Sequence, residues 1–177
     1  GLPQPASLYF LARAYELSGR HAEAARTYQK VFFGYPLTAE ATDASTRLQD
    51  LRLKMAAEYP APATELWQQR ADALFARSRW KDAETAYRSL AATAPDADVR
   101  QRANVRVAVC QYQAGSTWPA LNALAEMQLG DTAADAERLY IQSIGYRKLQ
   151  RIDQMQSFLE QLGKKYPSSP WYEKALV

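Results

Sequence analysis

A fixed spacing of residues that recurs along this 177-residue chain constrains its fold more than any other feature. The first copy begins at Leu8 and closes at Pro36, with two stretches of helical period separated by a turn at Gly19. A second copy begins at Trp67 and closes at Pro95, with matching residues at the same offsets. Recurring helical hairpins predict a repeat architecture, because one hairpin alone cannot bury its apolar face.

Small and large residues alternate across each hairpin in a way that fits helix packing. Two antiparallel helices approach closely where a small residue on one admits a bulky residue from the other. Ala12 and Ala24 are the small residues of the first copy, and Tyr15 and Tyr28 are the rings beside them. We therefore predict an all-α fold, a right-handed α-solenoid of about four helical hairpins with one inserted helix. An ordinary antiparallel bundle is the alternative, since alanine is common in this chain.

The predicted domain is a single solenoid over residues 1–177. Its repeats cover residues 6–36, 64–95, 98–129 and 133–167, of which the third lacks a closing proline. Residues 38–58 have helical period of their own, which predicts an unpaired inserted helix capped by Thr38. Residues 169–177 predict the opening turns of a further helix.

Residue types exclude several kinds of chemistry. Cys110 and His21 are the only cysteine and histidine, so we expect no disulfide, no four-ligand zinc site and no Cys/His nucleophile pair. The seven glycines are isolated and form no phosphate-binding loop. Asp96 and Asp98 are better explained as first-turn acids of a helix than as a catalytic pair, and His21 as a satisfied structural histidine. We predict no catalytic residue, no metal site and no cofactor.

The net charge and the hydropathy of the chain limit the kinds of partner that we expect. The formal net charge of +3 is spread over 22 basic and 19 acidic residues without a block, so we expect no nucleic-acid partner. No run approaches the ~18 apolar residues of a membrane helix, and we expect no transmembrane segment. Six basic residues of the third and fourth repeats could cluster where these repeats meet, although solvated faces are the favoured interpretation. They are Arg100, Arg102, Arg106, Arg147, Lys148 and Arg151.

Binding is the function that a solenoid favours, because its first helices line a concave wall. Residues one position beyond the packing face mix aromatic rings with charges of both signs. Such a surface suits a peptide, a partner helix or a sugar chain. The candidate groove residues are Tyr9, Arg13, Glu16, Gln68, Asp72, Phe75, Val109, Tyr112, Tyr140 and Arg147.

At the repeat offsets the chain resembles the tetratricopeptide family. The segments 11–20, 23–37 and 165–171 are also similar to the helical superhelix that precedes the catalytic domain in soluble lytic murein transglycosylases. That resemblance implies a non-catalytic scaffold or binding module of a periplasmic or cell-envelope protein, which reaches the glycan of peptidoglycan through a linked domain. The Glu-Ser signature of the catalytic domain is absent from these residues, so no catalytic residue carries over.

Two other hypotheses about function remain. The Tyr-Pro junctions at Pro36 and Pro167 are similar to those of tetratricopeptide lipoproteins and periplasmic partners, which implies a protein–protein adaptor in envelope or outer-membrane assembly. A stand-alone binder of a glycan or a peptide is the third hypothesis. We also expect the last helix to be cut short, which would leave Trp171 and Leu176 uncovered and favour an end-to-end dimer.

Overall fold

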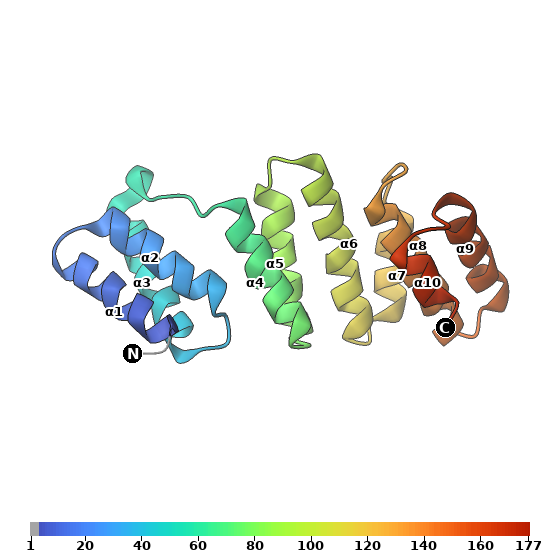
Figure 1. Cartoon of the computed structure of the whole chain (residues 1–177), viewed down its shortest axis with the longest axis horizontal. Coiled ribbons are helices and arrows are strands. Elements are labelled where there is room, and N and C mark those ends of the chain that lie inside the picture. Colours follow the sequence, from blue (N-terminus) through green and yellow to red (C-terminus); the bar gives the residue numbers. More distant parts are fainter. Residues whose placement is uncertain (1–3) are drawn as a thin grey trace. The chain divides into compact units, whose positions relative to one another are not determined.

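The computed structural model describes residues 4–177, and within them the chain forms α-helices, one 3₁₀ turn and no β-strand (Figure 1). The helices are α1 (Gln4–Leu17), α2 (His21–Gly34), α3 (Ala39–Met55), α4 (Thr64–Ala76), α5 (Trp80–Thr93), α6 (Ala97–Gln113), α7 (Thr117–Ala125), α8 (Ala133–Lys148), α9 (Ile152–Lys165) and α10 (Pro170–Ala175), and the 3₁₀ turn η1 is Ala56–Glu58. The prediction of an all-α fold built from consecutive helical hairpins is confirmed.

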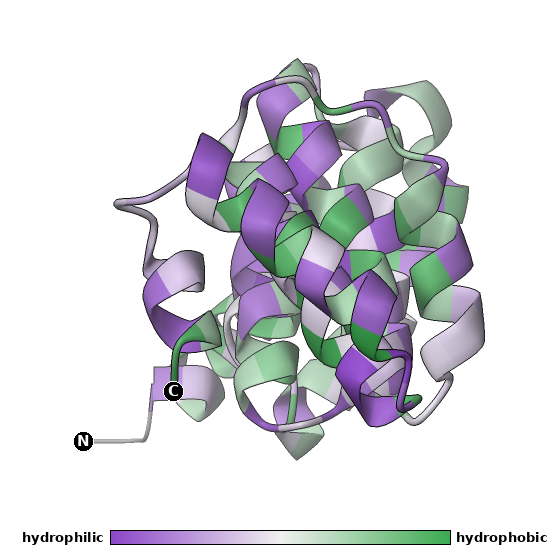
Figure 2. Ribbon diagram, turned by 90° about the vertical axis from the view of Figure 1, so that its right-hand side faces the viewer, coloured by the Kyte–Doolittle hydropathy of each residue, from purple (hydrophilic) through white to green (hydrophobic). Residues whose placement is uncertain are grey.

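The chain divides into two compact units, residues 1–86 and 87–177. Unit 1 holds α1 to α4 and the start of α5, and unit 2 holds the end of α5 and α6 to α10. Hydrophilic and hydrophobic residues alternate along individual helices (Figure 2). Amphipathic helices of this kind bury one stripe each, so each unit acquires a core of its own.

The hairpin turns have the same backbone geometry in all four predicted repeats. Counting offsets from Leu8, Trp67, Asn104 and Leu139, the residue at offset eleven has a positive φ in each repeat, and these residues are Gly19, Ser78, Gly115 and Gln150. The next residue donates its backbone N–H to the carbonyl at offset seven, as Arg20 does to Tyr15 at 2.9 Å and Arg151 does to Tyr146 at 3.0 Å. The left-handed conformation costs little for glycine and more for serine or glutamine. The second and fourth repeats therefore adopt the same turn with Ser78 and Gln150 in place of glycine.

The core of unit 1 contains the predicted pairing of alanine and tyrosine. Ala12, Ala24 and Tyr28 are each 0% exposed and belong to one apolar cluster, against which the half-buried Tyr15 packs. Arg70 stands where the first repeat has Leu11. Its guanidinium lies 3.8 Å from the centroid of the Phe32 ring and donates to the Phe32 carbonyl, and burial lowers its pKa.

Helix α3 is the predicted inserted helix. It packs against α2 and α1, and its Leu48 and Leu51 join the cluster around Tyr28. The junction explains why. At Tyr35 helix α2 has ended with φ −130° and ψ 56°, and Thr38 caps α3 by accepting from the Ala41 N–H at 3.2 Å. Helix α3 therefore occupies the place of the first helix of a next hairpin.

The same junction recurs in unit 2 between α9 and α10. Tyr166 has φ −133° and ψ 55°, and Ser169 caps α10 by accepting from the Tyr172 N–H at 3.1 Å. A Cβ added at Gly163 would lie 2.7 Å from the Tyr172 ring, so the absence of a side chain there lets α10 approach α9. Trp171 is half-buried on Tyr140, which corrects the expectation that it is uncovered, whereas Leu176 is 64% exposed.

Candidate functional site

In unit 1, two of the predicted groove residues, Arg13 and Glu16, form an ion pair that Tyr28 and Arg47 extend. Glu16 accepts from the Tyr28 hydroxyl at 2.7 Å and from Arg13 Nη1 at 2.8 Å, and Arg47 of α3 lies 3.8 Å from its second oxygen. Tyr9 packs on Tyr28 with ring centroids 5.7 Å apart. The polar groups of this face are therefore largely satisfied by one another.

Electrostatics agree with that geometry. Burial raises the pKa of the Glu16 carboxyl, but hydrogen bonds from Tyr28 and Arg13 and the charges of Arg13 and Arg47 outweigh it, so the pKa is lowered. The pKa of Tyr28 is raised, first by burial and then by its bond to the Glu16 carboxylate. Each shift stabilises the charge state that the hydrogen bond needs.

The other predicted residues of unit 1 come from α4. Gln68 and Asp72 are exposed, and Phe75 is half-buried with its ring 5.0 Å from that of Trp80 in an edge-to-face contact. Phe75 therefore contributes to packing within its own hairpin.

In unit 2, helices α6 and α8 are the first helices of successive hairpins, and α8 packs against both α6 and α10 (Figure 1). Tyr112 of α6 is half-buried. Burial raises the pKa of its hydroxyl, Tyr140 raises it further, and Arg147 opposes the shift, which places these three groups within one electrostatic neighbourhood. Val109 is 3% exposed, so it belongs to the core and offers no surface to a ligand.

Further residues complete this face. The Trp171 ring lies 5.4 Å from Tyr140, with the Arg106 guanidinium 5.8 Å and the Lys174 ammonium 4.6 Å from its centroid. Lys148 lies 5.3 Å from the Tyr112 ring. We call this surface the unit 2 wall. It consists of Arg106, Tyr112, Tyr140, Arg147, Lys148, Trp171 and Lys174.

The wall carries more positive than negative charge. Glu137 is buried and paired with Arg106 at 3.1 Å. Among residues 4–177, Arg147, Lys148 and Lys174 have no ion pair with an acid, and all three are exposed. These cations stay hydrated and available to a ligand.

The predicted cluster of six basic residues divides in the structure. Arg106, Arg147 and Lys148 belong to the wall. Arg100 instead donates to the carbonyls of Ala94 and Pro95 at 2.9 and 2.6 Å. The remaining two, Arg102 and Arg151, are exposed, so the solvated interpretation fits them.

Sequence reasoning missed Trp171 and Lys174 as site residues. Ser169 caps a helix that follows a closing proline, as Thr38 does in unit 1. That signal marks α10 as a first helix, and first helices supply the wall. Reading the junction in this way would have placed both residues on the candidate surface.

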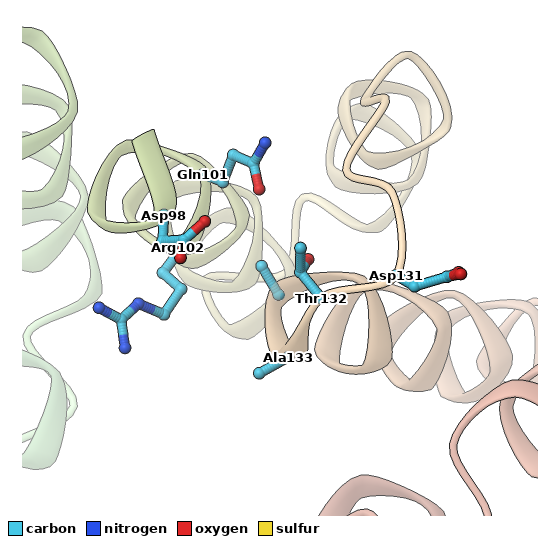
Figure 3. Close-up of a pocket in the computed structure, with 7 residues that line it drawn as sticks. Asp98, Gln101, Arg102, Asp131, Thr132 and Ala133 are labelled. Carbon is cyan, nitrogen blue, oxygen red and sulfur yellow. The ribbon is translucent and has the colours of Figure 1, made fainter. Parts of the chain in front are cut away.

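One pocket of about 300 Å³ in unit 2 lies between the starts of α6 and α8. Figure 3 shows Arg102 and Asp131, which line it, pointing away from each other. The Gln101 side-chain oxygen is buried there without a hydrogen-bond partner among the described residues, but most of the lining is open to solvent. We find no convergent charge in it.

Within residues 4–177, the other residues considered for catalysis or metal binding do not form a site. Asp96 caps α6 by accepting from the Val99 N–H at 2.9 Å, as predicted. His21 begins α2 beside a second open pocket, and no group in residues 4–177 hydrogen-bonds its Nδ1, so the prediction of a satisfied histidine is wrong at that atom. The described residues contain no group of three or more potential metal ligands.

Comparison with known protein families found a match over one repeat of the chain. The tetratricopeptide repeat family matches residues 139–169, which run from the middle of α8 through α9 to the cap of α10. No curated protein matches the chain. Tetratricopeptide repeats are generally non-catalytic modules for protein–protein interaction. No helix in residues 4–177 combines the length and apolar character that crossing a membrane requires.

Proposed function

We propose that this chain is a non-catalytic helical-repeat scaffold that binds a segment of another protein on the unit 2 wall. The observation that carries the proposal is the wall itself. Half-buried rings from α6, α8 and α10 stand beside exposed cations that have no acidic partner in the described residues. Rings with a fixed position and charges that remain hydrated are features of protein-binding surfaces.

A photo-crosslinking amino acid at Tyr112 tests this proposal, with the same substitution at Leu53 as the control. Leu53 is 83% exposed on α3 of unit 1 and far from the wall in sequence. We expect a protein that crosslinks from position 112 and not from position 53. That protein, once identified and purified, is expected to bind wild type and to lose binding to a wall variant. Equal crosslinking from both positions would contradict the proposal.

The cell-envelope setting is a second part of the proposal, supported by the resemblance of segments 11–20, 23–37 and 165–171 to the superhelix of soluble lytic transglycosylases. In that setting the scaffold stands beside a peptidoglycan-cleaving domain. The partly exposed Tyr140 and Trp171 rings also favour sugar stacking. The gene beyond Val177 tests the first point, because a lysozyme-like region with a Glu-Ser pair is expected there. Retention of the purified chain on insoluble peptidoglycan tests the second.

End-to-end pairing is supported by the exposure of Leu176. Light scattering of wild type and of Leu176→Lys measures it. A dimer that becomes a monomer in the variant is the expected result, and a wild-type monomer at all concentrations is the contrary one.

A further inference from the structure

The unit 2 wall also indicates the chemistry of its ligand. Its rings already lie beside cations of the chain itself, since Lys148 lies over Tyr112 and Lys174 lies over Trp171. A cationic ligand would have to compete with these ammonium groups for the ring faces. Anionic groups would instead gain from each lysine without displacing it from its ring.

Few acids oppose an anionic ligand on this face. Glu137 of α8 is buried and neutralised by Arg106, and Glu173 of α10 is exposed. Three exposed cations remain beside them, namely Arg147, Lys148 and Lys174. The placement of Arg147 and Lys148 in the last turn of α8 also complements the helix dipole, but that role leaves their outer donors free for a ligand.

The positive groups fall at two places along the wall. Arg106 and Lys174 gather around Trp171, which contacts Tyr140, while Arg147 and Lys148 lie two turns further along α8. Seven residues of helix span about 10 Å. An extended peptide in the polyproline II conformation rises about 3.1 Å per residue with three residues per turn, so carboxylates three residues apart lie on one face and match that separation.

We propose that the unit 2 wall binds an extended acidic segment of a partner protein, with one carboxylate near Trp171 and a second, three residues away, near Arg147 and Lys148. This inference rests on the proposed function and adds the charge and conformation of the ligand. A protein segment is favoured over a nucleic acid because the cations are few, whereas a phosphate backbone needs a longer positive track.

Fluorescence anisotropy with labelled synthetic peptides tests the inference on the full chain. The probes are a twelve-residue peptide containing Asp-Ala-Ala-Asp, its Asn-Ala-Ala-Asn and Lys-Ala-Ala-Lys counterparts, and one with both aspartates adjacent. We expect the Asp-Ala-Ala-Asp peptide to bind most tightly and to weaken as salt is raised. The adjacent pair is expected to bind less tightly, because it reaches only one of the two positive places.

The double variant Arg147→Glu/Lys148→Glu should weaken this peptide by about tenfold or more. Arg26→Glu/Lys30→Glu is the matched control, since it reverses two exposed charges on α2 of unit 1 and should change the affinity by less than about twofold. Circular dichroism of both variants checks that the helices are retained.

The alternatives give different results. If the neutral or basic peptide binds as tightly and the wall variant abolishes that binding, the acidic ligand is wrong and the proposed protein-binding function stands. If a single-stranded oligonucleotide binds more tightly than every peptide, the inference is also wrong. If no peptide binds and no protein crosslinks from position 112, both proposals fail.

Discussion

Glu16 of unit 1 and Arg147 of unit 2 occupy the same repeat offset, eight residues after Leu8 and Leu139, but their surroundings differ. Glu16 accepts hydrogen bonds from Tyr28 and Arg13 and faces Arg47. Arg147 has no ion pair with any acid in the described residues. The charge of Glu16 is therefore neutralised by neighbouring side chains, whereas the charge of Arg147 has no acidic partner among the described residues.

Neighbouring helices decide this difference. In unit 1 the second helix supplies the Tyr28 hydroxyl and α3 supplies Arg47, so the first helix meets partners on both sides. In unit 2 the residue that corresponds to Tyr28 is Leu159, which has no polar group to offer. The repeat offset therefore determines the position of a side chain. The neighbouring side chains determine whether it is paired within the protein or is accessible to a ligand.

The largest effect is expected from overpacking the core of unit 1. This change tests whether the Glu16 face of unit 1 and the unit 2 wall belong to separately folded units. Ala24 is fully buried against Tyr15 and Tyr28. Ala24→Leu has no space for the added carbons and should destabilise the chain by about 1–3 kcal/mol. Chemical denaturation measures the loss, and hydrogen exchange should locate it in unit 1. An unchanged midpoint of unfolding would contradict the alanine–tyrosine packing.

Ala120→Leu makes the same change at the same repeat offset in unit 2, where Ala120 is 0% exposed. A loss of about 1–3 kcal/mol is expected again, now with faster exchange confined to α6 to α8. Ala22→Leu, at a half-buried position in unit 1, is the control and should cost less. If both buried variants raise exchange equally throughout, the units unfold as one and cannot be compared as separate bodies.

Acid should weaken unit 1 through Glu16. Its pKa in the folded chain is below the ordinary value of 4.5, so its stabilising contribution is complete above pH 4.5 and disappears as the pH falls through the folded-state pKa. Glu16→Gln should lose about 1.5 kcal/mol at neutral pH, because the hydrogen bonds to a charged group are replaced by weaker ones. Its melting temperature should then fall less steeply in acid than that of wild type.

The sequence predicts the hairpins better than it predicts the surface. Offsets, alanines and closing prolines identify the paired helices because they record contacts within one repeat. The docking of α3 was missed because its own spacing matches no repeat, although Thr38 marks its start. The role of Trp171 depends on how α10 meets α8, and contacts between successive first helices leave no fixed spacing in the chain.

The smallest expected effects compare two helix caps. Thr38 of unit 1 and Thr132 of unit 2 each accept from a backbone N–H three residues on, at 3.2 Å. Replacing either by alanine should cost about 1 kcal/mol, because the first turn of α3 or α8 loses that bond. Serine at either position keeps the acceptor and should restore most of the loss. The two variants differ in consequence, since α8 carries Tyr140, Arg147 and Lys148 whereas α3 carries none of the wall. Thr132→Ala should therefore weaken the acidic peptide slightly, while Thr38→Ala leaves its affinity unchanged. An equal effect of both caps on peptide affinity would mean that the wall depends on unit 1 as well.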